Sequence, residues 1–129
     1  MDALPASLFA AFPPEVDTLA AWWDATAPAR VGGDTPIDRA LVGGACADRL
    51  GFAFAAGYAE ALHALVPATR DRLAVLCATE DGGAHPRAIR TTLCAVDDTG
   101  GGGAHYRLDG RKKWATAATA ATEIGRAHV

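Results

Sequence analysis

The pattern of apolar and polar positions predicts helices in the first half of the chain. Prolines at 13 and 14 followed by Glu15 suit a helix start, because proline fits the first turn and an acid there favours the helix dipole. Apolar residues then recur at helical spacing, at Val16, Leu19, Ala20 and Trp23. This first helix is expected to end by Pro28, with a loop over Arg30–Asp34.

A second helix start is predicted at Thr35. Its side chain can act as the N-cap, Pro36 fits the first helical position, and Asp38 stands where a capping box needs an acid. Two glycines, Gly43 and Gly44, weaken this helix by about 1 kcal/mol each relative to alanine.

The third predicted helix has the clearest periodicity. It begins near Asp48 and ends before Pro67. Gly51 and Gly57 lie inside it and are interpreted as points where another helix packs closely. One apolar stripe is predicted along it, formed by Leu50, Phe54, Tyr58, Leu62 and Leu65.

After about Arg72 the pattern changes to short strands. Leu73–Ala78 is an apolar run bounded by polar residues, which predicts a buried strand, and Thr91–Val96 predicts a second strand. A polar, glycine-rich turn is expected over Asp97–Gly103.

A hairpin is then predicted from His105–Leu108 to Arg111–Thr116. Asp109 and Gly110 between them form a strong hairpin signal, because both residues tolerate positive φ. Since helices precede strands without alternation, the sequence predicts an α+β fold with separate parts. We expect a helical domain over residues 1–72 and a β domain over residues 73–122.

Composition indicates which side chains are expected to form the core. The chain has 129 residues and is 50% hydrophobic, which suits a globular protein of one domain or slightly more. Much of the apolar content is alanine, so the core must depend on a few large side chains. These are Trp22, Trp23, Phe52, Phe54, Tyr58, Leu62, Leu65 and Trp114.

Charge and cysteine content exclude several classes of protein. The net charge of −3 argues against nucleic-acid binding. The single basic cluster, Arg111–Lys113, is interpreted as a solvated hairpin strand, with a phosphate-binding patch as the alternative. Three dispersed cysteines indicate neither a disulfide framework nor a zinc site.

The N-terminal segment and the residue usage bear on the setting of the protein. Ala3–Phe12 is neither a signal peptide nor a membrane span. Ten arginines against two lysines suggest a GC-rich gene. We expect a cytoplasmic, bacterial protein.

The last seven residues, Glu123–Val129, are treated separately. One allowed choice of codons for them looks like a common short-read sequencing adaptor. We therefore hypothesise that the reading frame ran from a genuine DNA fragment into adaptor, and that the native sequence continues beyond Thr122. A natural tail is the alternative, and the parent nucleotide record distinguishes the two.

Most motifs that carry chemistry are absent. There is no P-loop, no Gly-x-Gly-x-x-Gly after a strand and no Gly-x-Ser-x-Gly elbow. The histidines lack metal-ligand spacing, and His63 is interpreted as a residue on the polar face of the third helix. Two segments remain. One runs from Leu73 through Thr79-Glu80-Asp81-Gly82-Gly83 to Thr91, and the other is Tyr106–Thr116 with Gly110-x-Lys112-x-Trp114-Ala115-Thr116.

Together these two segments resemble the acyl-CoA dehydrogenase family. In that family the middle β-barrel-like domain opens with a strand ending in Thr-Glu and a glycine-rich turn, and a later Gly-x-Lys-x-Trp-Ile-Thr returns to the flavin. The resemblance implies that this chain is the helical first domain and the start of the middle domain, truncated before completion. It implies FAD bound by Leu76, Ala78, Thr79, Gly82, Gly83, Trp114, Ala115 and Thr116.

The chemistry of a flavin gives each of these matches a reason. Trp114 would supply stacking surface for the flat ring. Thr79 and Thr116 would satisfy its polar edge, and the Gly82–Gly83 turn would let backbone amides approach the pyrophosphate. Plain strand packing of the same residues is the alternative.

The turn departs from the family pattern. Ala84-His85-Pro86 replaces the usual Gly-Ser-Asp, and the segment is about one residue shorter. A serine hydroxyl for phosphate is therefore lost. His85 either replaces it or is an ordinary turn histidine. The departure weakens the expected pyrophosphate and acyl-CoA contacts and suggests a divergent branch.

By resemblance, the complete enzyme would oxidise an acyl-CoA thioester at Cα–Cβ and pass electrons to an acceptor, and it is expected to be a homo-oligomer. Its catalytic glutamate lies in a C-terminal helical bundle, so no residue here takes that role. Glu60 lies on a helix and Glu80 is expected to be a structural hydrogen bonder. The chain alone is expected to bind FAD weakly or not at all. A monooxygenase of the same fold, or a non-enzymatic module docking through the face along Leu50–Leu65, are the alternatives.

Overall fold

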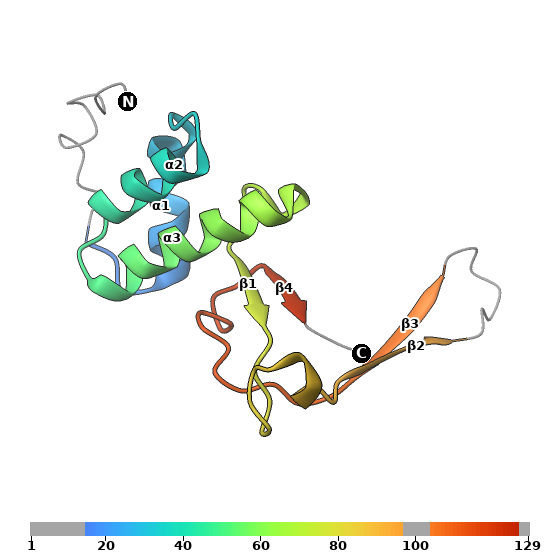
Figure 1. The fold of residues 1–129 in the computed structure, drawn as a ribbon. Coiled ribbons are helices and arrows are strands. Elements are labelled where there is room, and N and C mark those ends of the chain that lie inside the picture. Colours follow the sequence, from blue (N-terminus) through green and yellow to red (C-terminus); the bar gives the residue numbers. More distant parts are fainter. Residues whose placement is uncertain (1–14, 97–103, 127–129) are drawn as a thin grey trace. The chain divides into compact units, whose positions relative to one another are not determined.

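The computed structural model describes residues 15–96 and 104–126 and shows an α+β chain (Figure 1). The predicted fold class is confirmed. In chain order the elements are α1 (Leu19–Val31), α2 (Pro36–Ala45), α3 (Leu50–Leu65), the 3₁₀ helix η2 (Pro67–Thr69), β1 (Ala74–Cys77), the 3₁₀ helix η3 (Pro86–Ala88), β2 (Thr92–Val96), β3 (His105–Asp109) and β4 (Glu123–Arg126).

The chain divides into two units. The helical unit comprises Met1–Val75 with Ala117–Ile124, and the β unit comprises Leu76–Thr116 with Gly125–Val129. The sequence-based division placed residues 117–122 with the β segment, whereas in the structure they join the helical unit. A main-chain hydrogen bond joins this segment to the start of the β1 region, because the Thr122 amide donates to the Leu73 carbonyl over 3.1 Å.

Helix α1 begins and ends later than the sequence pattern predicts. Thr18 is its N-cap and accepts a hydrogen bond from the Ala21 amide, so residues 15–18 precede the helix. Pro28 lies inside the helix, which continues to Val31. The predicted start near Glu15 and end by Pro28 are therefore wrong. In the last turn, the Arg30 side chain folds back over the Trp23 ring of the same helix.

Helix α2 starts as its sequence predicts. The Thr35 side chain accepts from the Asp38 amide, and the Asp38 carboxylate accepts from the Thr35 amide over 3.0 Å, which completes the capping box. Further along the helix, a Cβ on Gly43 would lie 2.7 Å from the Ala56 Cβ, so glycine is needed where α2 approaches α3. Gly43 thus gives the helix pair a close packing distance at the expense of helix propensity.

Helix α3 has its predicted bounds but buries the opposite face from the one expected. The buried residues are Phe52, Ala55, Ala56, Ala59, Glu60 and His63. In the predicted apolar stripe, Leu50 is 85% exposed and Leu65 is 77% exposed. Gly51 and Gly57 have open space where a Cβ would stand, so the expected close helix contact at these glycines is wrong among the described residues. Small alanines on the inner face allow the close packing that large side chains would prevent.

The core of the helical unit is built around two tryptophans. Trp22 and Trp23 pack with Phe52, Ala56, Ala59 and Leu73, and the Trp22 and Phe52 rings lie 5.4 Å apart. The Trp22 indole Nε1 donates to the Cys46 carbonyl over 3.1 Å, which satisfies its buried polar atom. Of the predicted core residues, Trp22, Trp23 and Phe52 are confirmed, whereas Phe54, Leu65 and Trp114 are exposed.

The strands form two small sheets, and the described residues contain no closed barrel. β1 pairs with β4, and β2 pairs antiparallel with β3 from Thr92 opposite Asp109 to Val96 opposite His105. The predicted strands at residues 73–78 and 91–96 are confirmed by β1 and β2. The glycine-rich turn expected over Asp97–Gly103 lies outside the described residues.

The hairpin predicted about Asp109 and Gly110 does not form. Residues 111–116 form no strand, and β3 pairs instead with β2. A Cβ on Gly110 would collide with the Thr91 side chain and backbone, so this glycine permits a close approach of two segments rather than a turn at positive φ. Beyond Gly110 the chain contacts Thr79 instead, through the hydrogen bond from the Lys113 amide to the Thr79 carbonyl.

Three absences hold for the part of the chain that the structure describes. It contains no helix that is long and apolar enough to span a membrane. No group of three or more metal-ligating side chains gathers there. The cysteines form no disulfide; Cys46 and Cys77 are buried and Cys94 is exposed. The first residues of the hypothesised adaptor-derived tail form β4, and residues 127–129 lie outside the described part.

Candidate functional site

A buried carboxylate, Glu80, organises the β unit. Its Oε1 accepts from the Thr91 hydroxyl over 2.6 Å and from the Lys112 ammonium over 2.5 Å, and its carboxylate also accepts from the amides of Arg90 and Thr91. The hydrogen bond from Lys112, followed by that from Thr91, lowers the pKa of Glu80 to about 2. Glu80 is therefore a structural hydrogen-bond acceptor, as predicted.

The turn after Glu80 is closed by two reciprocal main-chain bonds. The Glu80 amide donates to the Gly83 carbonyl over 3.0 Å, and the Gly83 amide donates to the Glu80 carbonyl over 2.9 Å. Gly83 has φ +109°, which glycine adopts without strain. The Gly83 amide is thus already used within the turn, so it is not a donor for a pyrophosphate as the sequence pattern suggested.

The two segments that carry the family resemblance meet in this unit. The Lys113 amide donates to the Thr79 carbonyl over 2.8 Å, and Lys112 Nζ lies 3.5 Å from the Ala78 carbonyl. The next residue, Trp114, has φ +55° and a side chain that is 84% exposed. A bulky residue with positive φ is strained, and such strain persists only where surrounding contacts impose it.

The predicted cofactor residues fall into two groups within the β unit. Leu76, Ala78, Thr79, Gly82 and Gly83 follow one another along the end of β1 and its turn, and Trp114, Ala115 and Thr116 follow the contact with Thr79. Ala78, Thr79, Gly83 and Ala115 are half-buried, and the other four are exposed. The structure brings the strand end and the tryptophan segment together through the Lys113–Thr79 bond.

The basic cluster is neither a strand nor fully solvated. The Lys112 side chain is only 7% exposed in its ion pair with Glu80, and Lys113 Nζ pairs with Asp81 over 2.5 Å. The interpretation as a solvated hairpin strand is wrong, because these two lysines pair with the carboxylates of Glu80 and Asp81. His85 accepts from the Arg87 amide and caps η3, which makes it a turn histidine.

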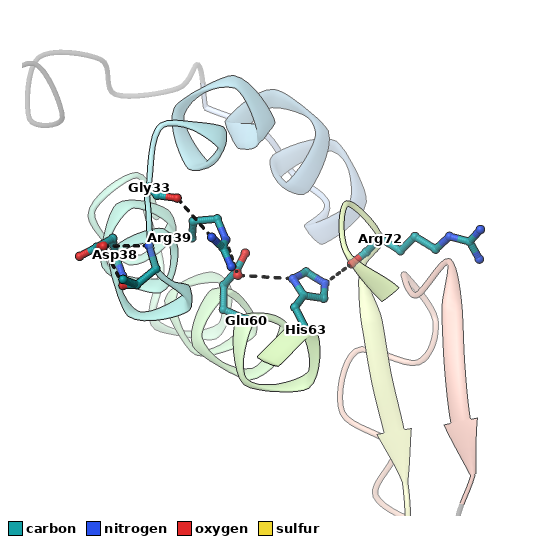
Figure 2. Close-up of polar contacts among 7 residues, drawn as sticks. Gly33, Asp38, Arg39, Glu60, His63 and Arg72 are labelled. Carbon is teal, nitrogen blue, oxygen red and sulfur yellow. Dashed lines mark hydrogen bonds and ion pairs between the residues drawn. The ribbon is translucent and has the colours of Figure 1, made fainter. Parts of the chain in front are cut away.

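The helical unit contains a second polar cluster, which the sequence did not reveal. Figure 2 shows Arg39, Glu60 and His63 converging from α2 and α3. Arg39 Nε donates to Glu60 Oε2 over 2.8 Å, and its Nη1 donates to the Gly33 carbonyl over 3.2 Å. His63 Nδ1 lies 3.4 Å from Glu60 Oε2. His63 is 5% exposed, so its interpretation as a polar-face residue is wrong.

The contacts of His63 determine its preferred tautomer. Nε2 lies 2.9 Å from the Arg72 carbonyl, which can only accept, so Nε2 carries a proton. In the neutral ring Nδ1 would then point a lone pair at the Glu60 carboxylate, and Nδ1 has no hydrogen-bond partner. Burial alone would lower the pKa of His63, but Glu60 and the Arg72 carbonyl outweigh burial and raise it. Burial likewise opposes ionisation of Glu60, yet His63 and Arg39 lower its pKa.

Arg30 is a third buried cation in this unit. Its guanidinium lies 3.6 Å from the centre of the Trp23 ring and donates to the Thr26 hydroxyl. It is 5% exposed, and no carboxylate of the described residues lies within ion-pair distance. Burial lowers the pKa of Arg30 to about 10, so it stays charged at neutral pH.

These side chains border a cavity of about 380 Å³ within the helical unit. Its size falls in the usual range for small-molecule pockets. The cavity is lined by Trp23, Ala27, Arg30, Val31, Arg39, Glu60, His63, Arg70 and Asp71.

Comparisons with protein-family models, with curated proteins and with solved structures find no match to this chain. The resemblance to acyl-CoA dehydrogenases therefore stays a prediction that depends on the residues quoted above.

Proposed function

We propose that this chain contributes the flavin-contacting segments of an FAD-dependent, acyl-CoA dehydrogenase-like oxidoreductase. In this proposal the helical unit corresponds to the first domain and the β unit to the opening strands of the middle domain. One observation carries the proposal: the Lys113–Thr79 main-chain bond of 2.8 Å brings together the two segments that resemble the family, although they are far apart in sequence.

The side chains around this contact suit the face and edge of an isoalloxazine ring. Trp114 presents an exposed aromatic ring, and flat apolar rings bind by stacking. Thr79 and Thr116 add hydroxyl groups that can donate to, or accept from, a polar ring edge. The strained backbone of Trp114 also supports the proposal, because such conformations gather at binding sites.

The turn fits a cofactor pyrophosphate less well. The Gly83 amide bonds within the turn, and His85 Nδ1 is engaged at the start of η3. Gly82 is exposed, and a Cβ there would come within 3.3 Å of Ala88, so this residue keeps the turn tight. We therefore place the expected FAD contacts mainly at the ring and assign no pyrophosphate donor.

FAD would supply the hydride acceptor, and the chain would position its ring. Neither buried glutamate suits proton abstraction. Glu80 accepts four hydrogen bonds and has a pKa of about 2, and Glu60 is ion-paired with Arg39. The proposal therefore includes a catalytic base outside these residues, together with an acyl-CoA substrate, an electron acceptor, homo-oligomerisation and a bacterial cytoplasmic setting.

An NMR titration of the ¹⁵N-labelled chain with FAD tests the proposed ring contact. We expect weak, saturable shifts centred on the Trp114 indole and on residues 76–83, and their loss in Trp114→Ala. Tyr106→Ala is the matched control, since Tyr106 is an exposed aromatic residue of the same unit. Wild-type shifts centred away from Trp114 and residues 76–83, or equal loss of the shifts in both variants, contradict the proposal.

A second candidate function is that of an interaction module using α3, and the inverted burial of this helix favours it. The residues of its outer face recur every three or four positions and none carries a charge, whereas Glu60 and His63 are buried. We propose a second copy of this chain as the partner. An uncharged face can meet its own copy without like-charge repulsion. The outer face consists of Leu50, Gly51, Phe54, Gly57, Tyr58, Ala61, Leu62 and Leu65.

A further inference from the structure

We propose that the cavity of the helical unit binds a small organic carboxylate, held by Arg30 and lined on its apolar side by Trp23, Ala27 and Val31. This site is separate from the flavin contacts proposed above, because every residue that lines it belongs to the helical unit.

The charges around the cavity are unbalanced. Three arginines and one histidine line it, against the carboxylates of Glu60 and Asp71. Glu60 is already shared between Arg39 and His63, and Arg30 has no carboxylate within ion-pair distance among the described residues. Buried charges are normally paired, so a cation buried beside an open cavity indicates an anionic ligand.

The buried imidazole of His63 is a second polar group beside the cavity. Its Nδ1 makes no hydrogen bond and lies 3.4 Å from Glu60 Oε2, and the ring borders the cavity. The pKa of His63 is raised, which favours the cationic ring and adds to the positive charge.

The geometry of Arg30 favours a carboxylate over a compact inorganic anion. One face of the guanidinium lies on Trp23, and one N–H is used by Thr26, which leaves further donors in a planar fork. Such a fork matches the two oxygens of a carboxylate. The neighbouring Trp23, Ala27 and Val31 surfaces can cover an apolar body. A cavity of about 380 Å³ lies near the lower end of the range for ligand pockets, which favours a small acid.

The probe for this site is sodium benzoate, titrated into the ¹⁵N-labelled chain. We expect saturable shifts of the Trp23 indole and of the residues near Ala27. Benzyl alcohol, which has the same ring without the charge, is expected to bind at least about tenfold more weakly, as is benzoate to Arg30→Met. Arg49→Met is the matched control, because Arg49 is an exposed arginine of the same unit, paired with Asp48 outside the cavity.

Ala27→Phe gives a second test that retains every charge. Ala27 lines the cavity, so a phenyl ring there should fill the space and abolish benzoate binding while the amide spectrum stays dispersed. This variant decides the matter if Arg30→Met fails to fold. The proposal is overturned if wild-type protein does not bind benzoate, if benzyl alcohol binds equally well, if inorganic phosphate binds more tightly than benzoate, or if Ala27→Phe binds benzoate normally.

Discussion

Glu80 shows how one side chain can order a segment that has little apolar core. The strands β2 and β3 are exposed along their whole length, so burial contributes little to their stability. Instead, the Glu80 carboxylate binds the start of β2 through Thr91 and the segment after β3 through Lys112. Loss of either charge would leave a buried partner unpaired.

We expect acid to loosen the β unit through Glu80. Its folded-state pKa of about 2 lies below the ordinary value of about 4.3, so its contribution to stability is complete above the ordinary value and is lost as the pH falls through about 2. The amide signals of Arg90 and Thr91, followed by NMR from neutral to acid pH, should report this loss, because both amides donate to Glu80.

Glu80→Gln is the matching variant. It keeps the shape of the side chain but removes the charge that Lys112 pairs with. At neutral pH we expect faster hydrogen exchange at Thr91, and in acid a flatter pH response of these amides. If the variant and the wild type respond to acid identically, another group governs this segment; Asp81, whose pKa Lys113 lowers, would be the first to examine.

At the scale of elements, local signals and tertiary contacts contributed differently to each helix. Helix α2 begins where its capping box indicated, because all the partners lie within four residues. Helix α3 also has the predicted bounds, but periodicity could not decide which of its two apolar faces is inside. The inner face is set by Gly43 of α2, whose missing side chain admits Ala56.

The capping box of α2 should contribute measurably to the stability of the helical unit. We expect Thr35→Ala to lower the free energy of unfolding by about 1 kcal/mol, because it leaves the Asp38 amide without its acceptor. Urea unfolding followed by tryptophan fluorescence measures this change. Thr119→Ala is the control, since Thr119 is exposed in the same unit, and a comparable loss in that variant would argue against a capping effect.

At the scale of the whole molecule, the distribution of apolar surface is the feature that most needs explanation. Helix α3 exposes large side chains at Leu50, Phe54 and Leu65, while its acidic side chain, Glu60, and its basic side chain, His63, lie inside. Folded chains rarely leave a contiguous apolar face in water without a partner. Both functional proposals can accommodate this face, because an oligomeric enzyme and an interaction module each need an apolar contact surface.

We expect the purified chain to self-associate through this face. Phe54→Lys places a charge in the middle of the exposed stripe and should shift the sedimentation behaviour towards monomer, since burying an unpaired lysine is costly. Val96→Lys, at an exposed apolar residue of β2, is the control and should leave the association unchanged. A wild-type chain that stays monomeric over a wide range of concentrations would rule out the second copy as partner.

Features that depend on residues close together in the sequence could be predicted, whereas contacts between residues far apart in the sequence could not. The α+β class, the start of α2, the bounds of α3 and the strands β1 and β2 were predictable, because periodicity and capping depend on neighbours a few residues away. The Thr79 and Trp114 segments were selected by resemblance, and their meeting through the Lys113 amide is a contact that no local pattern contains.

Only the tertiary structure decided which side chains are buried and which segments pair. It placed Gly110 against Thr91 in place of a hairpin turn, and it joined Arg39, Glu60 and His63 beside a cavity. These outcomes depend on close approach and charge pairing between distant residues, whose energies arise only once the backbone has brought them together. The sequence alone determined which segments are helical and which are extended. Packing determined which of their side chains are buried and which polar side chains lie together.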